Sequence, residues 1–483
     1  MRLRPVLRAM SMLSGAVLAT ACAVGPDYHR PPVETAANFK EAADWKPSEP
    51  NDVLSRGPWW HIFNDDVLSG LEDQINISNQ NVKAAEAAFE QSRALVSQAE
   101  AGFWPTIGAS LGLQRSGAPT GASNVTGAIT GTGAATRTQN TYTASGTVNW
   151  DLDIWGKIRR STESNVASAQ ANSAALAAAR LSAQGELATD YFELRAQDQL
   201  QKLLDDTVVA ETLSLQITQS RYKFGVAARA DVVTAETQLL SSQAQQVNAR
   251  IQRAILEHAV AVLVGKQPAE FSVSPATLRT DVPTVPAGVP STLLERRPDV
   301  AEAERKMAAA NAQIGVAKAG YFPDLTLSGQ DQYSNGLFSQ LFHDSNRIWA
   351  VGPRLAQTLF DGGLVRAQVR GARAAYEGTV DSYRQTVLAG FQQVEDEIVT
   401  LRVLEQQGVI EDETVKKARE AETLTLNQYK AGTVPYSSVI TAQTTRLSAE
   451  ETALQVLSSR LQASVALIEA LGGGWEASQA TAK

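Results

Sequence analysis

The side chains best suited to chemistry in this sequence are one cysteine and four histidines, and neither set forms a recognisable site. Cys22 is the only cysteine, so the chain has no internal disulfide. The four histidines are His29, His61, His258 and His343. They lack the close spacing of zinc ligands, and the sequence has no glycine-rich phosphate loop or nucleophile–base motif. We therefore expect a protein that is not an enzyme and that needs no metal ion or soluble cofactor.

Cys22 has a different meaning when the residues before it are considered. Three arginines among the first eight residues precede a weakly apolar run at 9–21, which is the layout of a secretory signal peptide and is too short to span a bilayer. The run ends Ala-Thr-Ala-Cys and resembles a bacterial lipobox, although Ala19 stands where leucine is common. We predict that residues 1–21 are removed and that Cys22 carries an N-acyl chain and a diacylglycerol. The alternative is an ordinary signal peptide with an incidental cysteine.

The charge of the chain and the residue after the cysteine bear on its partners and location. The formal net charge is -8 at pH 7, and removal of a segment with three arginines and no acidic residue makes it more negative. An acidic chain is a poor partner for nucleic acid. Ala23 follows the cysteine, where many lipoproteins of the inner membrane have aspartate. We therefore expect the chain in the outer membrane, in contact with its lipid.

Most of the remaining sequence favours long helices. Stretches rich in Ala, Gln, Ser, Glu and Arg consist of strong helix formers, and proline is absent from 157–267, from 354–434 and after 435. Such stretches permit helices of roughly 60 residues, or about 90 Å, which is a length typical of coiled coils. No run of about 18 apolar residues follows the signal peptide, so no transmembrane helix is expected.

The sequence contains an internal repeat. AGFWP at 101–105 recurs as AGYFP at 319–323, and LDIWGKIR at 152–159 pairs with LFDGGLVR at 359–366. RYKFGVAARADVVTAET, which begins at Arg221, pairs with QYKAGTVPYSSVITAQT, which begins at Gln428. Two halves derived from one ancestral unit explain these matches. The segment between the halves, 268–290, has five prolines and is expected to be an extended linker.

Between the paired motifs, each half contains segments that alternate like strands. Residues 106–114 and 141–150 alternate apolar and small or polar side chains with aromatics near the ends, as transmembrane β-strands do. Residues 324–329 and 348–360 are the second-half candidates, and Pro353 in the latter predicts a bulge or an edge position. Four strands cannot close a barrel, so copies must combine to give 8, 12 or 16 strands. The alternative is two surface hairpins on a helical protein.

Three further segments resemble a known family. They are AVGPDYHRPP at 23–32, WWHIFNDDVLSGLEDQI at 59–75 and LLERRPDVAEAE at 293–304. They are similar to the hallmarks of outer-membrane efflux factors, the TolC-like channels, and specifically to the lipidated OprM/NodT-type branch. The resemblance implies a homotrimer with a 12-stranded β-barrel, four strands per chain, that continues into a long periplasmic α-helical coiled-coil barrel. It also implies a passive channel that receives substrates from an inner-membrane efflux transporter through a periplasmic adaptor protein.

The repeat and the resemblance together predict how the chain is organised. After the signal peptide comes a lipidated extended segment at 22–60. The first repeat, 61–267, contains a β-hairpin at about 106–152 and a coiled-coil pair. The linker 268–290 precedes the second repeat, 291–472, with its hairpin at about 324–360 and a second coiled-coil pair. Residues 473–483 form a flexible tail.

The turn of each coiled-coil pair is the candidate functional site. Gly225 and Gly432 each interrupt a very long helix, so each marks a reversal of the chain. In the family that the chain resembles, residues just after the second-half glycine form a periplasmic aperture, often with acidic side chains. The candidates carried over to this sequence are Ser438, Thr441, Asp231, Tyr429, Gly432, Tyr222 and Gly225. Asp231 is either a partner in closing contacts or a helix cap.

Several residues at element boundaries are expected to be structural. Asp151, Asp153 and Asp361 precede long helices and are expected to cap them. Pro298 and Asp299 are expected to begin the first helix of the second half.

Two functions fit these observations. A passive outer-membrane export duct uses both the helices and the amphipathic strands. A structural coiled-coil lipoprotein of the envelope, without channel activity, uses the helices and Cys22 but leaves the strands without a role. The sequence does not name the exported substrate.

Overall fold

The computed structural model describes residues 23–32, 39–41, 58–119, 136–285 and 296–473. The predicted signal peptide, Cys22, part of the linker and the tail after residue 473 lie outside these ranges. The chain divides into two compact units. Unit 1 comprises residues 1–30, 91–169 and 305–380, and unit 2 comprises residues 31–90, 170–304 and 381–483. Each unit contains segments from both halves of the sequence.

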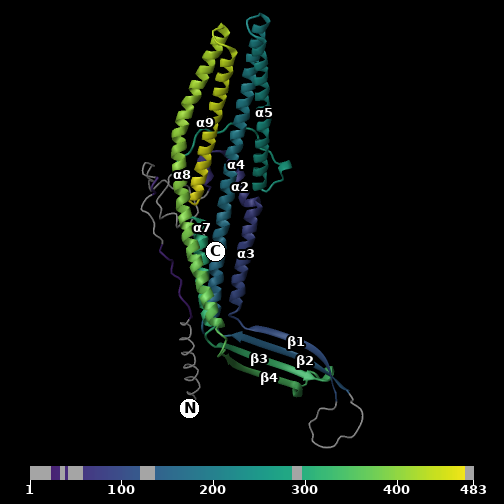
Figure 1. Ribbon diagram of the computed structural model, residues 1–483. Coiled ribbons are helices and arrows are strands. Elements are labelled where there is room, and N and C mark those ends of the chain that lie inside the picture. The colour runs from purple at the N-terminus through teal and green to yellow at the C-terminus, as the bar shows by residue number, and fades with distance from the viewer. Residues whose placement is uncertain (1–22, 33–38, 42–57, 120–135, 286–295, 474–483) are drawn as a thin grey trace, which may run out of the picture. The chain divides into compact units, whose positions relative to one another are not determined.

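Most of the described residues are helical (Figure 1). The helical elements are η2 (Trp59–Phe63), α2 (Asp66–Ser78), α3 (Gln80–Ala101), α4 (Lys157–Lys223), α5 (Arg229–Leu263), η3 (Pro268–Glu270), α7 (Pro298–Ala319), η4 (Phe338–Gln340), η5 (Asp344–Asn346), α8 (Leu364–Ala431) and α9 (Tyr436–Ala470). The proline-free stretches contain long helices, as predicted: α4 has 67 residues and α8 has 68. None of the helices in the described ranges combines the length and apolar character needed to span a membrane.

The helices of the two halves correspond in length. Helices α3 and α7 have 22 residues each, and α5 and α9 have 35 residues each. With α4 and α8, three helices of the first half therefore have partners of nearly equal length in the second half. This correspondence is what duplication of one structural unit produces.

Four strands form one antiparallel sheet in unit 1. They are β1 (Thr106–Pro119), β2 (Thr136–Asp151), β3 (Asp324–Asn335) and β4 (Arg347–Ala356), in the order β1-β2-β3-β4. The first three strands are longer than the sequence predicted, and the fourth ends at Ala356 rather than at residue 360. Pro353 lies in β4, opposite Leu327, at the edge of the sheet, where a residue without an N–H is tolerated.

Aspartates precede the long helices α4 and α8, whose first turns lie in unit 1. The Asp153 carboxylate accepts hydrogen bonds from the backbone N–H groups of Ile158 and Arg159, each at 2.9 Å. Asp361 accepts from those of Gly363 and Val365, at 2.7 and 2.9 Å. Both aspartates satisfy N–H groups that lack partners within the helix, as predicted.

The prediction that Asp151 is also a cap was wrong. Asp151 is the last residue of β2 and is still paired in the ladder opposite Thr326. The free N–H groups at the start of α4 are instead bonded by Asp153.

Pro298 is the first residue of α7, as predicted, and the residue before it anchors this helix in unit 2. Arg297 donates hydrogen bonds to both Asp299 carboxylate oxygens, at 3.0 and 2.7 Å. It also donates to the carbonyl oxygen of Ala470 at 2.9 Å and to Gln393 Oε1 at 2.9 Å. Because Arg297 is buried and its donors are used within the unit, its role is structural.

Unit 2 has the larger apolar core. Residues of η2, α2, α4, α8 and α9 contribute to one cluster, in which Trp59 and Phe63 contact each other edge to face and Phe63 also packs on Phe192. Tyr191 lies in the same cluster and donates a hydrogen bond from its hydroxyl to Asp65 Oδ2 at 2.8 Å. Asp65 also caps α2, so this bond joins α4 to the start of α2.

The described part of the proline-rich linker is extended but is held firmly against unit 2. Arg195 donates to the carbonyl oxygen of Ser274 at 2.7 Å, and Arg253 donates to that of Val273 at 2.7 Å. The buried Asp198 pairs with both arginines, at 3.0 and 2.7 Å, and accepts from the backbone N–H of Ala276 at 3.1 Å. This segment is therefore a packed strap between the two halves.

Candidate functional site: a two-faced sheet and two helical tips

The register of the sheet separates its side chains into two faces. Residues directly opposite each other point to the same side. Ile107, Val148, Gly329 and Val351 align across the four strands, as do Ser110, Ser145, Gln332 and Ile348. One face therefore carries most of the large apolar side chains, and we call it the apolar face. Its members include Ile107, Leu111, Leu113, Tyr142, Val148, Trp150, Leu325, Leu327, Tyr333, Trp349, Val351 and Leu355.

The opposite face, which we call the polar face, carries mainly hydroxyl and amide side chains. Thr143, Ser145 and Thr147 of β2 lie on it beside Ser328, Gln330, Gln332 and Ser334 of β3. The Ser110 and Ser145 hydroxyls are hydrogen-bonded to each other at 2.8 Å. A four-stranded sheet with one apolar and one polar face and two unpaired edges is suited to line a water-filled space with lipid on its other side.

Aromatic side chains fix the junction between the sheet and the helices of unit 1. The indole N–H of Trp150 donates to the carbonyl oxygen of Phe103 at 2.9 Å. The indole N–H of Trp155 donates to the carbonyl oxygen of Pro323 at 2.9 Å. Trp155 also stacks on Phe322, with ring centroids 4.7 Å apart. Both proline-containing motifs of the repeat therefore act as turns between a helix and a strand.

The residues that follow Cys22 lie at this same junction. The backbone N–H of Val24 donates to the carbonyl oxygen of Trp155 at 3.0 Å. Gly25 has φ +124°, and a Cβ on it would lie 2.6 Å from the Cα of Gly315, so both positions need glycine. Asp27 pairs with Arg160 at 2.7 Å, and the hydrogen bond from Arg160 lowers the pKa of the Asp27 carboxyl. Cys22 itself lies outside the described residues.

The first helical tip joins α4 to α5. Gly225 has φ +72°, and the backbone N–H of Val226 donates back to the carbonyl oxygen of Arg221 at 2.9 Å, which closes the end of α4. Tyr222 is exposed on this turn. Asp231 lies in the first turn of α5, and its carboxylate accepts from the backbone N–H of Ala228 at 3.2 Å. This contact is a helix cap, one of the two roles considered for Asp231; its part in closing contacts between copies stays a prediction.

The second tip joins α8 to α9 around Gly432, whose φ is +81°. Tyr429 is 4% exposed and packs against Tyr436, with ring centroids 5.2 Å apart. Because Tyr429 is buried within one chain, it positions the tip rather than forming its surface. Thr441 is exposed and Ser438 is half-buried, so these two candidates remain accessible on the outside of α9.

Arg221, to which the sequence pattern gave no role, holds the two tips together. Its guanidinium lies 4.8 Å above the centre of the Tyr429 ring and donates to the carbonyl oxygen of Lys430 at 2.8 Å. The hydroxyl of Tyr429 in turn contacts the Thr218 hydroxyl at 3.4 Å. The repeat contained a signal, because Arg221 aligns with an uncharged residue, Gln428. The first half thus supplies a cation for which the second half has no counterpart.

A buried carboxyl in α2 was also missed. Glu72 is fully buried, and neither carboxyl oxygen has a hydrogen-bond partner. Burial raises its pKa to about 9, so the carboxyl is protonated at neutral pH. The spacing of Leu68, Leu71 and Ile75, which face the core, was the available signal, because Glu72 falls on the same helical face.

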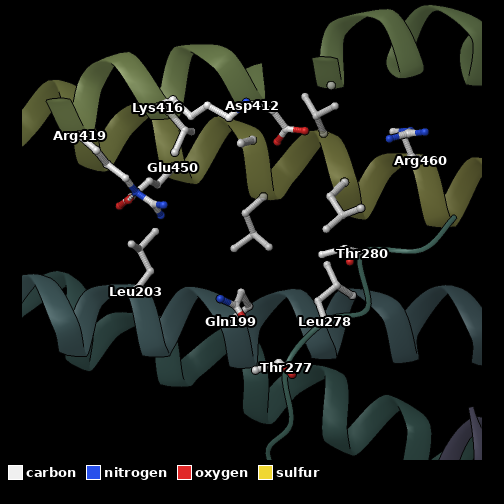
Figure 2. Close-up of a pocket in the computed structure, with 16 residues that line it drawn as sticks. Gln199, Leu203, Thr277, Leu278, Thr280, Asp412, Lys416, Arg419, Glu450 and Arg460 are labelled. Carbon is white, nitrogen blue, oxygen red and sulfur yellow. Dashed lines mark hydrogen bonds and ion pairs between the residues drawn. The ribbon is translucent and has the colours of Figure 1, made fainter. Parts of the chain in front are cut away.

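Unit 2 also contains a cavity of about 670 Å³ between α4, the strap, α8 and α9 (Figure 2). Leu203 and Leu278 form part of its apolar wall. Arg419 and Glu450 lie on the opposite side and form a hydrogen-bonded ion pair at 2.6 Å between α8 and α9. Across the described residues, no three His, Cys, Asp or Glu side chains gather as a metal site. Arg419 and Glu450 are therefore engaged with each other and join α8 to α9.

Comparison with known families decides the identity. The model of one family, described as outer membrane efflux protein, matches residues 71–266 and 289–473. The chain belongs to the outer membrane efflux protein family. The two matched segments correspond to the two halves recognised in the sequence, so both halves contribute to the identification.

Related proteins and a solved structure agree with the family. The efflux protein is 27% identical over 473 residues to the probable efflux pump outer membrane protein TtgC of Pseudomonas putida, covering 96% of each chain. It is 29% identical over 438 residues to nodulation protein T of Rhizobium leguminosarum bv. trifolii, covering 88% of this chain and 89% of the other. The outer-membrane channel OprN has 30% identity and a TM-score of 0.84, covering 94% of this chain and 100% of that one.

Membership of this family explains why the sheet has one apolar and one polar face. The efflux protein lies in the outer membrane and has the fold of TolC-like channels. A membrane β-sheet in such a channel directs its apolar side chains to lipid and its polar side chains to the lumen. The expected TolC-like fold, outer-membrane location and efflux function are confirmed.

Proposed function

We propose that three copies of this efflux protein form a homotrimer that passively conducts substrates out of the cell. The observation that carries the proposal is the two-faced sheet with unpaired edges at β1 and β4. Unpaired strand edges are too costly in hydrocarbon for one copy to insert alone. Three copies supply 12 strands, and their polar faces then line one continuous lumen. Conduction needs no covalent chemistry from the chain.

The long helices extend the lumen into the periplasm. Exposed apolar side chains follow α5 at Leu240, Val247, Ile251 and Ile255, with α8 contributing Val409 and Ile410. Spacings of seven and four residues are those of a helix–helix seam. In the assembly these rows are covered by neighbouring copies. The far ends of the helices receive substrate from an inner-membrane efflux transporter through a periplasmic adaptor protein.

The lipid on Cys22 anchors the mature chain beside the membrane. The proposal is supported by the position of Ala23 and Val24 at the junction of the sheet and the helices. A Cβ on Gly156 would lie 2.8 Å from the Cα of Ala23. A lipid chain attached one residue earlier reaches the adjacent leaflet without further extension of the backbone. Acyl chains then add about 0.8 kcal/mol of membrane affinity per buried CH₂.

The aperture of the channel is formed where the second tips meet at the molecular axis. We assign its surface to Thr441 and Ser438, and its rigidity to Tyr429, held by Arg221 as described above. Gly225 and Gly432 supply the turns, Tyr222 lies on the outside of the first tip, and Asp231 maintains the start of α5. With no acidic side chain from α9 at this level, the entrance lacks a built-in preference for cations.

Native mass spectrometry of the chain in mild detergent tests the proposal. We expect the mass of three chains, each increased by the mass of its lipid. Cys22→Ser is the matched variant; it loses the lipid mass and incorporation of a labelled fatty acid but keeps the three-chain mass, because the strands supply their own burial. A monomer with intact β-sheet in its circular dichroism spectrum contradicts the trimer, and equal fatty-acid label in both proteins contradicts the anchor.

A further inference from the structure

The loop between β3 and β4 is folded onto one side of the sheet. Residues 336–346 contain η4 and η5, and two of their rings pack on tyrosines of the strands. The Phe338 ring lies 5.6 Å from that of Tyr142, and the Phe342 ring lies 5.5 Å from that of Tyr333. Both tyrosines belong to the apolar face. The loop therefore covers the apolar face and leaves the polar face, which lines the lumen, uncovered.

The loop has a defined conformation that presents apolar groups outward. Leu341 is fully buried, and Asn335 accepts a hydrogen bond from the backbone N–H of Leu337 at 2.8 Å. Leu337, Phe338 and Phe342 are nevertheless 58%, 57% and 64% exposed. We call these three residues, with Tyr142 and Tyr333, the aromatic ledge. It continues the membrane-facing surface at the end of the strands farthest from the helices.

The charged residues of the apolar face gather near this ledge. Arg347 lies opposite Tyr333, and Asp331 lies opposite Trp349. Arg347 donates to both Asp331 oxygens, each at 2.9 Å. Arg115 lies two residues beyond Leu113 on the same face of β1, is exposed, and has no ion pair within the described ranges. Asp344 of η5 adds a negative charge near Arg347, so Arg115 is the cation on the strands of this face that has no ion pair within the described ranges.

We propose that the aromatic ledge and Arg115 bind a phosphorylated lipid of the outer leaflet. Ring side chains at the boundary between hydrocarbon and head groups are favourable because one side of the ring is apolar while the polar atoms remain hydrated. An arginine at that depth matches the charge and the geometry of phosphate. The acyl chains contact Phe338 and Phe342, and the phosphate is bound by Arg115. The ion pair of Arg347 with Asp331 neutralises the remaining charge on this face.

This inference rests on the proposed function only in placing the sheet in the membrane. The competing occupant of the ledge is a second copy of the chain, because β4 is an edge strand. A lipid and a protein neighbour predict different surroundings for the same side chain, so a probe attached at Phe342 distinguishes them.

The first experiment places a nitroxide on the full chain in vesicles. Phe342→Cys is labelled in a Cys22→Ser background, with Ser334→Cys of the polar face as the matched control. We expect the Phe342 label to be relaxed more strongly by oxygen than by a water-soluble nickel complex, and the Ser334 label to show the reverse. Greater access to nickel at Phe342 overturns the proposal. So does spin–spin broadening that disappears on dilution with unlabelled chain, because it indicates another copy.

The second experiment tests the phosphate. Unfolding of the assembled wild-type protein is followed in vesicles that contain either lipid A or its monophosphoryl form. We expect a higher midpoint with lipid A, loss of that difference in Arg115→Gln, and its retention in Arg354→Gln, whose side chain lies on the polar face. Equal midpoints for the wild type in both lipids, or an unchanged difference in Arg115→Gln, contradict the proposal. Single-channel conductance of each variant shows separately whether the channel itself is intact.

Discussion

Replacement of Gly315 by alanine should release the segment that follows Cys22 while leaving the rest of the chain folded. Gly315 lies within α7, where residues 24 and 25 cross the helix at close range. A Cβ there would lie 2.7 Å from Arg160 Cγ and 2.8 Å from the carbonyl oxygen of Val24. One of these atoms is backbone, and the other is near the base of a buried side chain, so neither can move away easily.

The magnitude follows from the contacts that oppose the clash. Overpacking of this kind costs about 1–3 kcal/mol. The segment is held by a hydrogen bond from Val24 to Trp155 and by one from Asn311 Nδ2 to the carbonyl oxygen of Pro26, each 3.0 Å long, which together contribute about 1–3 kcal/mol. The ion pair of Asp27 adds little, because its carboxylate is exposed to water. The clash and these hydrogen bonds are similar in size, so residues 24–26 should detach, while Tyr28, which packs on Ala308 and Ala309, holds the chain beyond them.

Hydrogen exchange of the purified, assembled protein measures this release. The backbone N–H of Val24 should exchange roughly tenfold faster or more in Gly315→Ala, and the midpoint of global unfolding should change little. Gly371→Ala is the matched control, since Gly371 lies within α8 with no atom near its added Cβ and alanine favours a helix. Unchanged exchange at Val24 in Gly315→Ala would refute the close approach of the segment to α7.

Three other changes probe the rest of the chain. Because burial raises the pKa of Glu72 to about 9 from 4.5, the folded chain retains a proton that the unfolded chain releases. The free energy of unfolding of the wild type should therefore fall as pH rises from 4.5 to about 9. Glu72→Gln should lack this decline and should unfold at a higher temperature than the wild type at pH 8. Parallel profiles of unfolding temperature against pH for the two proteins contradict this. Asp198→Asn should lower the free energy of unfolding by about 3–5 kcal/mol in urea titrations, because it leaves the buried Arg195 without its counter-charge, and a loss below 1 kcal/mol argues against the strap's ion network. Thr441→Cys should form oxidant-dependent covalent dimers on gels, since a disulfide needs Cα atoms about 4.4–6.8 Å apart, whereas Ser145→Cys in the sheet should not; monomers for both place the constriction elsewhere.

The features that sequence predicted well depend on local chemistry. The absence of proline between residues 157 and 267 predicted the long helix α4, and the alternation at 141–150 predicted strand β2. Reversals of the chain were expected at residues 225 and 432, and both glycines have positive φ, a conformation that residues with a Cβ rarely adopt. These features depend on backbone preferences of a few residues, so they can be recognised without knowing what lies opposite them.

The features that were missed depend on contacts between distant parts of the chain. The burial of Tyr429 depends on Arg221, which is 208 positions earlier in the numbering, and no local pattern joins them. Asp151 was predicted to be a cap because strand length was underestimated, since the ladder with β3 extends β2 to its last residue. The packing of the linker depends on Arg195 of α4 and Arg253 of α5. The prolines of the linker therefore predicted its extended backbone but not its attachment to unit 2.

Single-channel recording tests the central claim most directly. The purified full chain, at the mass of three copies, is added to a planar lipid bilayer at fixed voltage. We predict discrete conductance steps, because the polar faces of the three sheets enclose one water-filled path. A preparation that has the three-chain mass and an intact β-sheet yet produces no steps under any applied voltage would contradict the channel, and would leave the structural envelope lipoprotein as the better account.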